Sequence, residues 1–190
     1  QNMLCVGCAV EMTYQETKKN HVRRPIPSNK RINFFEGVWF FPGSAIMIKT
    51  EDFLNVGGFD ENLRRLEDYD FFCRFGLYGG KFIPVNDVLC SIKRAHHASM
   101  KEVMGAANYL LKKHRVQRIG FKAEIALRSY LSLERAAIFY FNHKLIMAFL
   151  FLSLSFILRP RLNIPIRKWW PNQPNLILKL MNIMKKMVIV

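Results

Sequence analysis

Short apolar runs separated by polar turns fill the first hundred residues, and this pattern predicts short strands and short helices. The runs predicted as strands are Leu4–Met12, Gly37–Lys49 with a break at Pro42-Gly43, and Lys81–Val85 and Val88–Arg94 around a turn at Asn86-Asp87. The predicted helices are Glu51–Val56, with Thr50 as its cap, and Glu67–Tyr78. The polar, basic stretch Thr13–Asn33 is predicted to be a surface loop. Short strands alternating with short helices predict an α/β sheet layer.

From Ser99 onward the pattern changes to that of longer helices. The segment Ser99-Met-Lys-Glu102 matches a capping box, which predicts a helix running to about His114. Two more helices are predicted over Phe121–Asn142 and Leu145–Leu158. The last run has 14 residues, whereas a helix that crosses a bilayer needs about 20. We therefore predict two parts, an α/β layer in residues 1–98 and an α-helical region in residues 99–190.

The net charge of +15 belongs almost entirely to the second part. Residues 1–100 hold 13 Lys and Arg against 11 Asp and Glu, whereas residues 101–190 hold 16 against 3. No acidic residue follows Glu134. A charge asymmetry of this size indicates that the two parts have different roles.

Three interpretations of the basic region remain open. Lys and Arg among long aliphatics, with Trp169-Trp170 in the same region, favour a helical surface that docks on an anionic membrane. A helical appendage with solvated charges is the second interpretation. Nucleic-acid binding is the third and the least favoured, because the basic residues are spread singly and no recognised binding motif is present.

The four cysteines do not form a metal-ligand pattern. Cys5 and Cys8 have C-x-x-C spacing, which is typical of a redox pair or of half a zinc site, but no second pair of ligands follows at the spacing of a zinc site. Cys73 and Cys90 occur singly within apolar runs. We predict buried, reduced thiols without a chemical role.

Three carboxylates gather where a glycine-rich turn meets the start of a predicted helix. The series is Gly57-Gly-Phe-Asp-Glu61, then Glu67-Asp-Tyr-Asp70, with Arg74 one turn later. Acids at a helix N-terminus most often serve the helix dipole alone. Asp70 and Arg74 are spaced to form an ion pair on that helix.

The order of these elements resembles inverting glycosyltransferases of family 2, which have a GT-A-type, Rossmann-like fold. The resemblance covers about residues 1–99 and corresponds to the C-terminal half of the catalytic domain. It implies transfer of a sugar from a nucleotide-sugar donor to a hydroxyl of a glycan or lipid-linked acceptor. Surface-polysaccharide biosynthesis at the inner, cytoplasmic face of the plasma membrane is the expected setting, with no nucleic-acid partner.

The resemblance also implies roles for individual residues. Asp68 would be the catalytic base, Glu67 would orient Asp68 or the acceptor, and Asp60 would line the acceptor side. Asp70 and Arg74 are expected to be mainly structural, with a phosphate-binding role as the alternative for Arg74. The small residues Gly43, Ser44 and Ala45 would floor the sugar-binding cleft, unless they are simply a tightly packed strand. His96 would reach a metal–diphosphate group, unless it is an ordinary surface residue.

The donor-side features of the resembling family are not found in this sequence. The expected cofactor is a divalent cation, Mg or Mn, which an Asp-x-Asp motif in an N-terminal half would mainly bind. Asp68-Tyr-Asp70 has the letters of that motif but belongs to the base motif. The sequence begins with Gln1 and with an apolar run that is already predicted as a strand, so we expect it to be incomplete. The alternative is a truncated, non-catalytic remnant that acts as a membrane-associated module.

Overall fold

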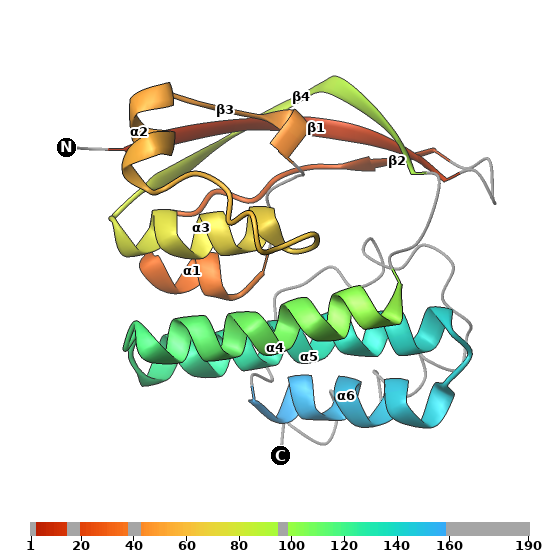
Figure 1. Cartoon of the computed structure of the whole chain (residues 1–190). Helices are drawn as coiled ribbons and strands as arrows, with labels where there is room; N and C mark the ends of the chain where they lie inside the picture. Colours follow the sequence, from red (N-terminus) through yellow and green to blue (C-terminus); the bar gives the residue numbers. More distant parts are fainter. Residues whose placement is uncertain (1–2, 15–19, 38–42, 95–98, 159–190) are drawn as a thin grey trace, which may run out of the picture.

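The computed structural model describes residues 3–14, 20–37, 43–94 and 99–158. Its elements in chain order are β1 (Leu4–Tyr14), β2 (Asn20–Arg23), α1 (Arg31–Phe35), the 3₁₀ turn η1 (Gly43–Ala45), β3 (Ile46–Ile48), α2 (Thr50–Asn55), α3 (Glu67–Leu77), β4 (Lys81–Arg94), α4 (Met100–Val116), α5 (Phe121–Phe141) and α6 (Leu145–Leu158). A sheet forms the first layer, α1 and α3 lie beneath it, and α4, α5 and α6 lie beyond them (Figure 1). This arrangement confirms the predicted α/β class.

Strand β1 organises the sheet because it pairs along both of its edges. One edge pairs antiparallel with β3 through Cys5–Gly7 and with β2 through Val10–Thr13. The other edge pairs parallel with β4 along the whole of β1. Buried apolar residues along β1 occur at both odd and even positions, so side chains are buried on both faces of this strand. The predicted strand over Leu4–Met12 is therefore confirmed and extends to Tyr14.

Strand β4 is one continuous strand, so the prediction of two strands around a turn was wrong. Cys8 of β1 pairs with Val85, and its neighbour Ala9 pairs with Val88. The exposed residues Asn86 and Asp87 are therefore extra residues in an irregularity of the β4 register. Because β1 continues to pair with β4 on both sides of it, the turn-forming pair bends the strand without reversing it.

Three local predictions in residues 13–50 also need correction. The predicted surface loop contains β2 and the first three residues of the five-residue helix α1. The small residues Gly43–Ala45 form a 3₁₀ turn, and only the three residues of β3 after them are a strand. Residues 38–42 of the predicted strand lie outside the described residues. Helix α2 already includes Thr50, and its N-cap is Lys49, which makes no capping hydrogen bond through its side chain.

Helix α3 is the centre of the main hydrophobic core. Its predicted apolar side chains Phe71, Phe72 and Phe75 are fully buried. Phe34 of α1 stacks on Phe72 and meets Phe75 edge-on, with ring centroids 6.4 and 5.7 Å apart. The contact is close because Gly76 of α3 presents no side chain toward Phe34. The predicted helix Glu67–Tyr78 is confirmed to within one residue.

The cysteines behave largely as predicted. Cys5, Cys8 and Cys73 are buried, Cys90 is half-buried, and all four are free. Cys5 and Cys8 are three residues apart on a strand, so they face opposite sides of the sheet and belong to different core clusters. Burial raises the pKa of the Cys5 thiol to about 12, so this thiol is not reactive near neutral pH.

Helices α4 and α5 pack into the same core as α3. The predicted capping box at the start of α4 is confirmed, with Ser99 Oγ accepting from the Glu102 N–H at 3.2 Å and Glu102 Oε2 accepting from the Ser99 N–H at 3.0 Å. One cluster of buried residues includes Phe71 and Phe72 together with Leu110 of α4 and Leu127 of α5. The predicted boundary between residues 98 and 99 therefore does not coincide with a break in the core.

Helix α6 packs on α5 through one face. Ser129 of α5 and Ser155 of α6 exchange hydrogen bonds between each hydroxyl and the other residue's carbonyl oxygen, at 2.9 and 2.8 Å. Phe139 stacks on Phe151 with ring centroids 5.4 Å apart. The opposite face carries apolar side chains that remain exposed: Leu145, Ile146, Phe149, Leu150, Leu154 and Ile157. Within the described residues, every helix is too short or too polar to cross a membrane.

Two glycine substitutions are expected to change the stability of the fold in opposite directions. A Cβ at Gly76 would lie 2.6 Å from Cδ2 and 2.9 Å from Cβ of Phe34, so Gly76→Ala is expected to destabilise the fold by about 1–3 kcal/mol. Gly105 of α4 has nothing within 4 Å of its position, so Gly105→Ala is expected to stabilise by about 0.5–1 kcal/mol. Urea unfolding followed by circular dichroism measures both. Equal stability of Gly76→Ala and wild type would contradict the close α1–α3 contact.

Candidate active site

The loop between α2 and α3 places the acidic series at the start of α3. Gly57 and Gly58 adopt φ of 91° and 62°, in the left-handed region where glycine is favoured. The loop ends at Leu66, whose φ of 61° is unusual for a residue with a branched side chain. Glu67 and Asp68 follow as the first two residues of the helix. The backbone path of this loop therefore decides where their carboxylates stand.

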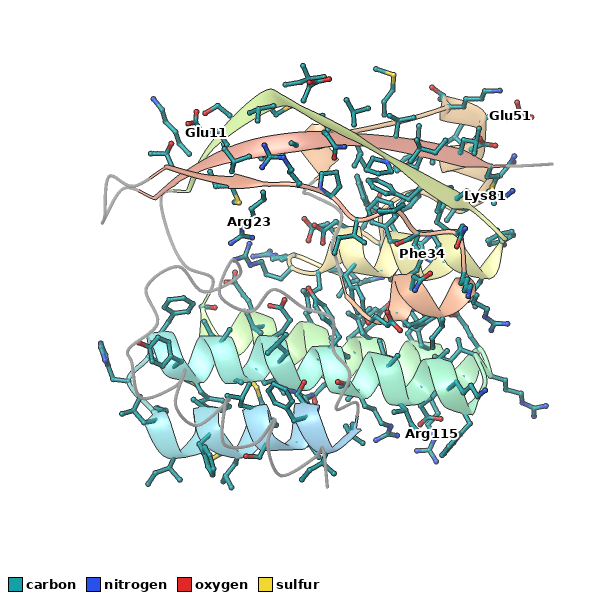
Figure 2. The ribbon with its side chains drawn as sticks, turned by 180° about the vertical axis from the view of Figure 1, so that it is seen from behind. Glu11, Arg23, Phe34, Glu51, Lys81 and Arg115 are labelled. Atoms are coloured by element: carbon teal, nitrogen blue, oxygen red, sulfur yellow. The ribbon has the colours of Figure 1, made fainter. Side chains whose placement is uncertain are left out.

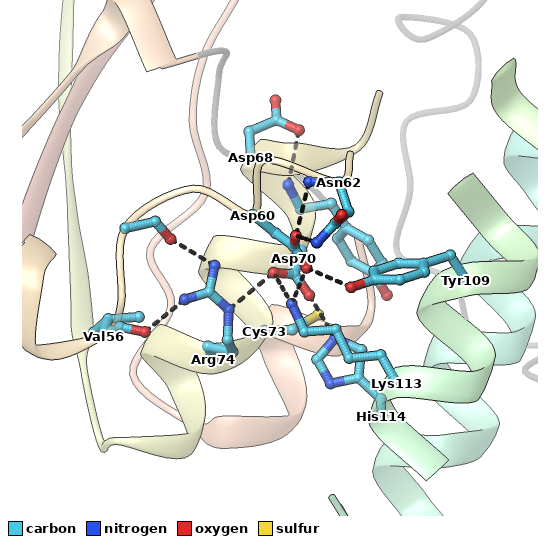
Figure 3. A network of polar contacts seen from close by, with 12 residues as sticks. Val56, Asp60, Asn62, Asp68, Asp70, Cys73, Arg74, Tyr109, Lys113 and His114 are labelled. Atoms are coloured by element: carbon cyan, nitrogen blue, oxygen red, sulfur yellow. Dashed lines mark hydrogen bonds and ion pairs between the residues drawn. The ribbon is translucent and has the colours of Figure 1, made fainter. Parts of the chain in front are cut away.

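Asp68 and Asp70 are separated by the geometry of the helix itself. Two residues span about 200° around an α-helix, so their side chains leave on nearly opposite sides. Asp68 is half-buried, and its Oδ1 accepts a hydrogen bond of 2.7 Å from the Tyr69 N–H. Its carboxylate points away from the cluster around Asp70 (Figure 3). Glu67 is half-buried.

Asp70 is a fully buried carboxylate that contacts three side chains. Its Oδ2 accepts from Arg74 Nε at 2.8 Å and from Lys113 Nζ at 2.8 Å (Figure 3). Its Oδ1 lies 3.1 Å from His114 Nε2. Burial raises the pKa of the Asp70 carboxyl, but the hydrogen bonds from His114 and Lys113 and the charge of Arg74 outweigh burial and hold this pKa below its usual value. Asp70 is therefore ionised in the folded protein at neutral pH.

Arg74 connects this carboxylate to the glycine turn. Its side chain is buried, and its two terminal nitrogens donate to the carbonyl oxygens of Val56 and Gly58. The predicted i,i+4 pair of Asp70 and Arg74 is present. These contacts fit the structural role expected for Arg74, and its phosphate-binding alternative stays a prediction.

Asp60 is held by residues of its own turn and of α4. Its Oδ1 accepts from the N–H and the side-chain amide of Asn62, both at 3.0 Å. Its Oδ2 accepts from Lys113 Nζ at 2.6 Å and from the Tyr109 hydroxyl at 3.0 Å. Burial raises the pKa of Asp60, but these hydrogen bonds outweigh it and hold the pKa well below its usual range. Asp60 therefore has a structural role in holding this turn against α4. Its predicted acceptor-side role stays a prediction.

Sequence reasoning missed the three residues of α4 that complete this cluster. Tyr109, Lys113 and His114 lie 43 to 53 residues from their partners in the chain. His114 is fully buried, and its Nδ1 has no hydrogen-bond partner among the described residues. One signal was available in the sequence, since Tyr109 and Lys113 are four residues apart and thus share a helix face.

The remaining predicted site residues are less informative. Ala45 is buried, Ser44 is exposed, and both lie in η1 rather than in a strand. The Ala45 carbonyl oxygen is 3.8 Å from Cys8 Sγ, which places this turn against the sheet. Figure 2 shows the molecule from behind, with Glu11 on the sheet and Arg115 on the helical layer at the opposite side. Their role as a cleft floor, together with Gly43, stays a prediction. His96 lies outside the described residues, and the described residues contain no group of three His, Cys, Asp or Glu side chains that could hold a metal ion.

Comparison with known proteins identifies the family. The family model described as "Glycosyltransferase like family 2" matches residues 27–123, which is just over half of the chain. No curated protein and no solved structure gives a significant match. The matched region includes the loop, α3, β4 and α4, and therefore all residues of the cluster around Asp70. With its mixed α/β fold, consistent with part of a GT-A domain, the chain belongs to glycosyltransferase-like family 2.

Proposed function

We propose that this chain is the acceptor-side part of an inverting glycosyltransferase in which Asp68 is the catalytic base. The observation that carries the proposal is that the acids in the loop and at the start of α3 have different surroundings. Asp60 and Asp70 share Lys113, whereas the Asp68 carboxylate points away from that cluster (Figure 3). Family membership supports a glycosyltransferase with a nucleotide-sugar donor and an acceptor.

The proposed reaction needs a base at this position. The acceptor hydroxyl attacks the anomeric carbon of the donor sugar, the bond from that carbon to the diphosphate oxygen breaks, and the nucleoside diphosphate leaves with the bonding electrons. The hydroxyl proton passes to the Asp68 carboxylate, so the nucleophile carries more negative charge as it attacks. Glu67 precedes Asp68 on the same first turn, where it is proposed to orient the base or the acceptor.

The proposal includes a divalent cation, Mg or Mn, held mainly by residues outside this sequence. Such a cation would neutralise charge on the departing diphosphate. His96 is the candidate ligand within this sequence. This part of the proposal rests on the family resemblance.

We further propose that α6 lies on an anionic membrane and that the acceptor is lipid-linked, as in surface-polysaccharide biosynthesis at the cytoplasmic face. The exposed outer face of α6 is apolar from Leu145 to Ile157. The following residues 159–190 carry seven Lys and Arg and no acid. An apolar helix face next to a basic segment is the composition that binds anionic interfaces.

Loss of the base is the first test. Asp68→Asn in the full-length protein is expected to lower transfer by about 10²–10⁴-fold, because the amide cannot accept the hydroxyl proton. Release of nucleoside diphosphate from a panel of UDP-, GDP- and dTDP-sugars, with lipid extract as acceptor, measures transfer. Donor affinity and the circular dichroism spectrum are expected to stay unchanged.

The matched control is Glu51→Gln, an exposed carboxylate on α2 that has no proposed part in the reaction. It is expected to keep wild-type transfer. Wild-type turnover by Asp68→Asn would eliminate Asp68 as the base. Loss of turnover in the control as well would point to a general effect of surface charge.

Membrane binding is tested with vesicles of phosphatidylglycerol and phosphatidylcholine. Ile146 and Ile157 are 79% and 74% exposed. The double change Ile146→Ser, Ile157→Ser is expected to reduce co-sedimentation with anionic vesicles at least tenfold, because the lipid contact loses two apolar side chains. Met47→Ser is the control, since Met47 is 76% exposed but belongs to β3, and the sheet lies at the opposite side of the molecule from α6 (Figure 1). Equal loss in both variants, or salt-sensitive binding to duplex DNA in place of vesicles, would overturn the membrane proposal.

A further inference from the structure

Lys113 of α4 joins two parts of the site that both lie far from it in sequence. Its ammonium group lies 2.6 Å from Asp60 Oδ2 in the loop and 2.8 Å from Asp70 Oδ2 in α3. The Lys113 side chain is 20% exposed, and those of Asp60 and Asp70 are 11% and 0% exposed. Three charged groups with so little exposure interact strongly, because water screens them weakly.

The loop from Gly57 to Leu66 is therefore held from two sides. Arg74 of α3 binds the carbonyl oxygens of Val56 and Gly58 at the beginning of the loop. Lys113 and Tyr109 of α4 bind the Asp60 carboxylate further along. Asp60 in turn fixes the following turn, because it accepts from the N–H groups of Asn62, through its carboxylate, and Leu63, through its carbonyl.

The end of this loop needs such support. Leu66 adopts a left-handed conformation directly before Glu67 and Asp68, and a residue other than glycine keeps that conformation only when its surroundings fix it. Without the Lys113 ammonium, the carboxylates of Asp60 and Asp70 would repel each other across the position it leaves. The turn at Asp60 would then move away from α3, and the strained entry into the helix would relax.

We infer that Lys113 is a positioning residue for sugar transfer: by clamping the Asp60 turn onto α3, it sets the place of the Asp68 carboxylate relative to the acceptor hydroxyl. The inference rests on the proposed function of Asp68. It assigns to α4, a helix outside the acidic series, a part in the reaction without contact with the substrate. A displacement of about 1 Å in a reacting group is enough to slow a reaction about 10²-fold.

The first measurement follows the loop itself. Lys113→Met removes the charge and keeps most of the side-chain length, and Lys112→Met removes an exposed charge from the neighbouring position on α4. Amide hydrogen exchange of Asn62 and Leu63, followed by NMR in the full chain, is expected to accelerate at least tenfold in Lys113→Met and to stay unchanged in Lys112→Met. Lys113→Arg, which retains the charge, is expected to restore most of the protection. Unchanged exchange in Lys113→Met overturns the clamp.

The second measurement separates positioning from mere stability. With the donor found in the nucleotide-sugar panel, Lys113→Met is expected to lower kcat about 10–100-fold while the donor KM stays within about twofold. Lys113→Arg is expected to recover kcat, and an unchanged circular dichroism spectrum of Lys113→Met at the assay temperature shows that the lower kcat does not come from loss of folded protein. A loop that loosens while kcat stays at the wild-type value overturns the positioning role. Wild-type turnover by Asp68→Asn would instead overturn the proposed base, so the two failures are distinguishable.

Discussion

The buried carboxylate of Asp70 is the constraint from which the rest of the site follows. An ionised carboxylate with no exposed side-chain surface is costly unless charges and hydrogen bonds compensate for its lost hydration. Arg74 from its own helix and Lys113 and His114 from α4 supply them. This requirement fixes α4 against α3, and it brings Arg74 and Lys113 into positions from which both also bind the preceding loop.

The cluster also gives the acids of the series different chemical roles. Asp60 and Asp70 each accept several hydrogen bonds from cationic and neutral donors, and their pKa values are held low, so they act as fixed anions. Asp68 is only two residues from Asp70 but leaves the helix on the other side (Figure 3). A single helical turn thus carries an anion that holds the structure together and a carboxylate directed elsewhere, which we propose to be the base.

The sequence pattern predicted the long elements well, because they carry enough residues for a period to show. Helices α3, α4, α5 and α6 and strand β1 appear where their apolar periods and caps place them. Strand β2 and helix α1 were missed because, with four and five residues, they are too short to show a hydrophobic period. The turn signal at Asn86-Asp87 was real, but the pairing of β4 with β1 on both sides converted it into a bulge.

Prediction of the site reached only its local part. The ion pair of Asp70 and Arg74 follows from their spacing on one helix. Lys113 and His114, by contrast, appear in the sequence as two of many basic residues near the end of a helix. Basic residues are common there because positive charge interacts favourably with the helix dipole. Only the folded structure, in which α3 and α4 contribute to one buried core, shows that they reach Asp70.

A crystal structure of the full-length protein with a nucleoside diphosphate and an acceptor analogue tests the division of the acids most directly. The account predicts an acceptor hydroxyl at hydrogen-bond distance, roughly 2.6–3.2 Å, from the Asp68 carboxylate, with Lys113 still bridging Asp60 and Asp70. An acceptor hydroxyl bound instead to Asp60 or Asp70, with Asp68 remote from it, would contradict the account.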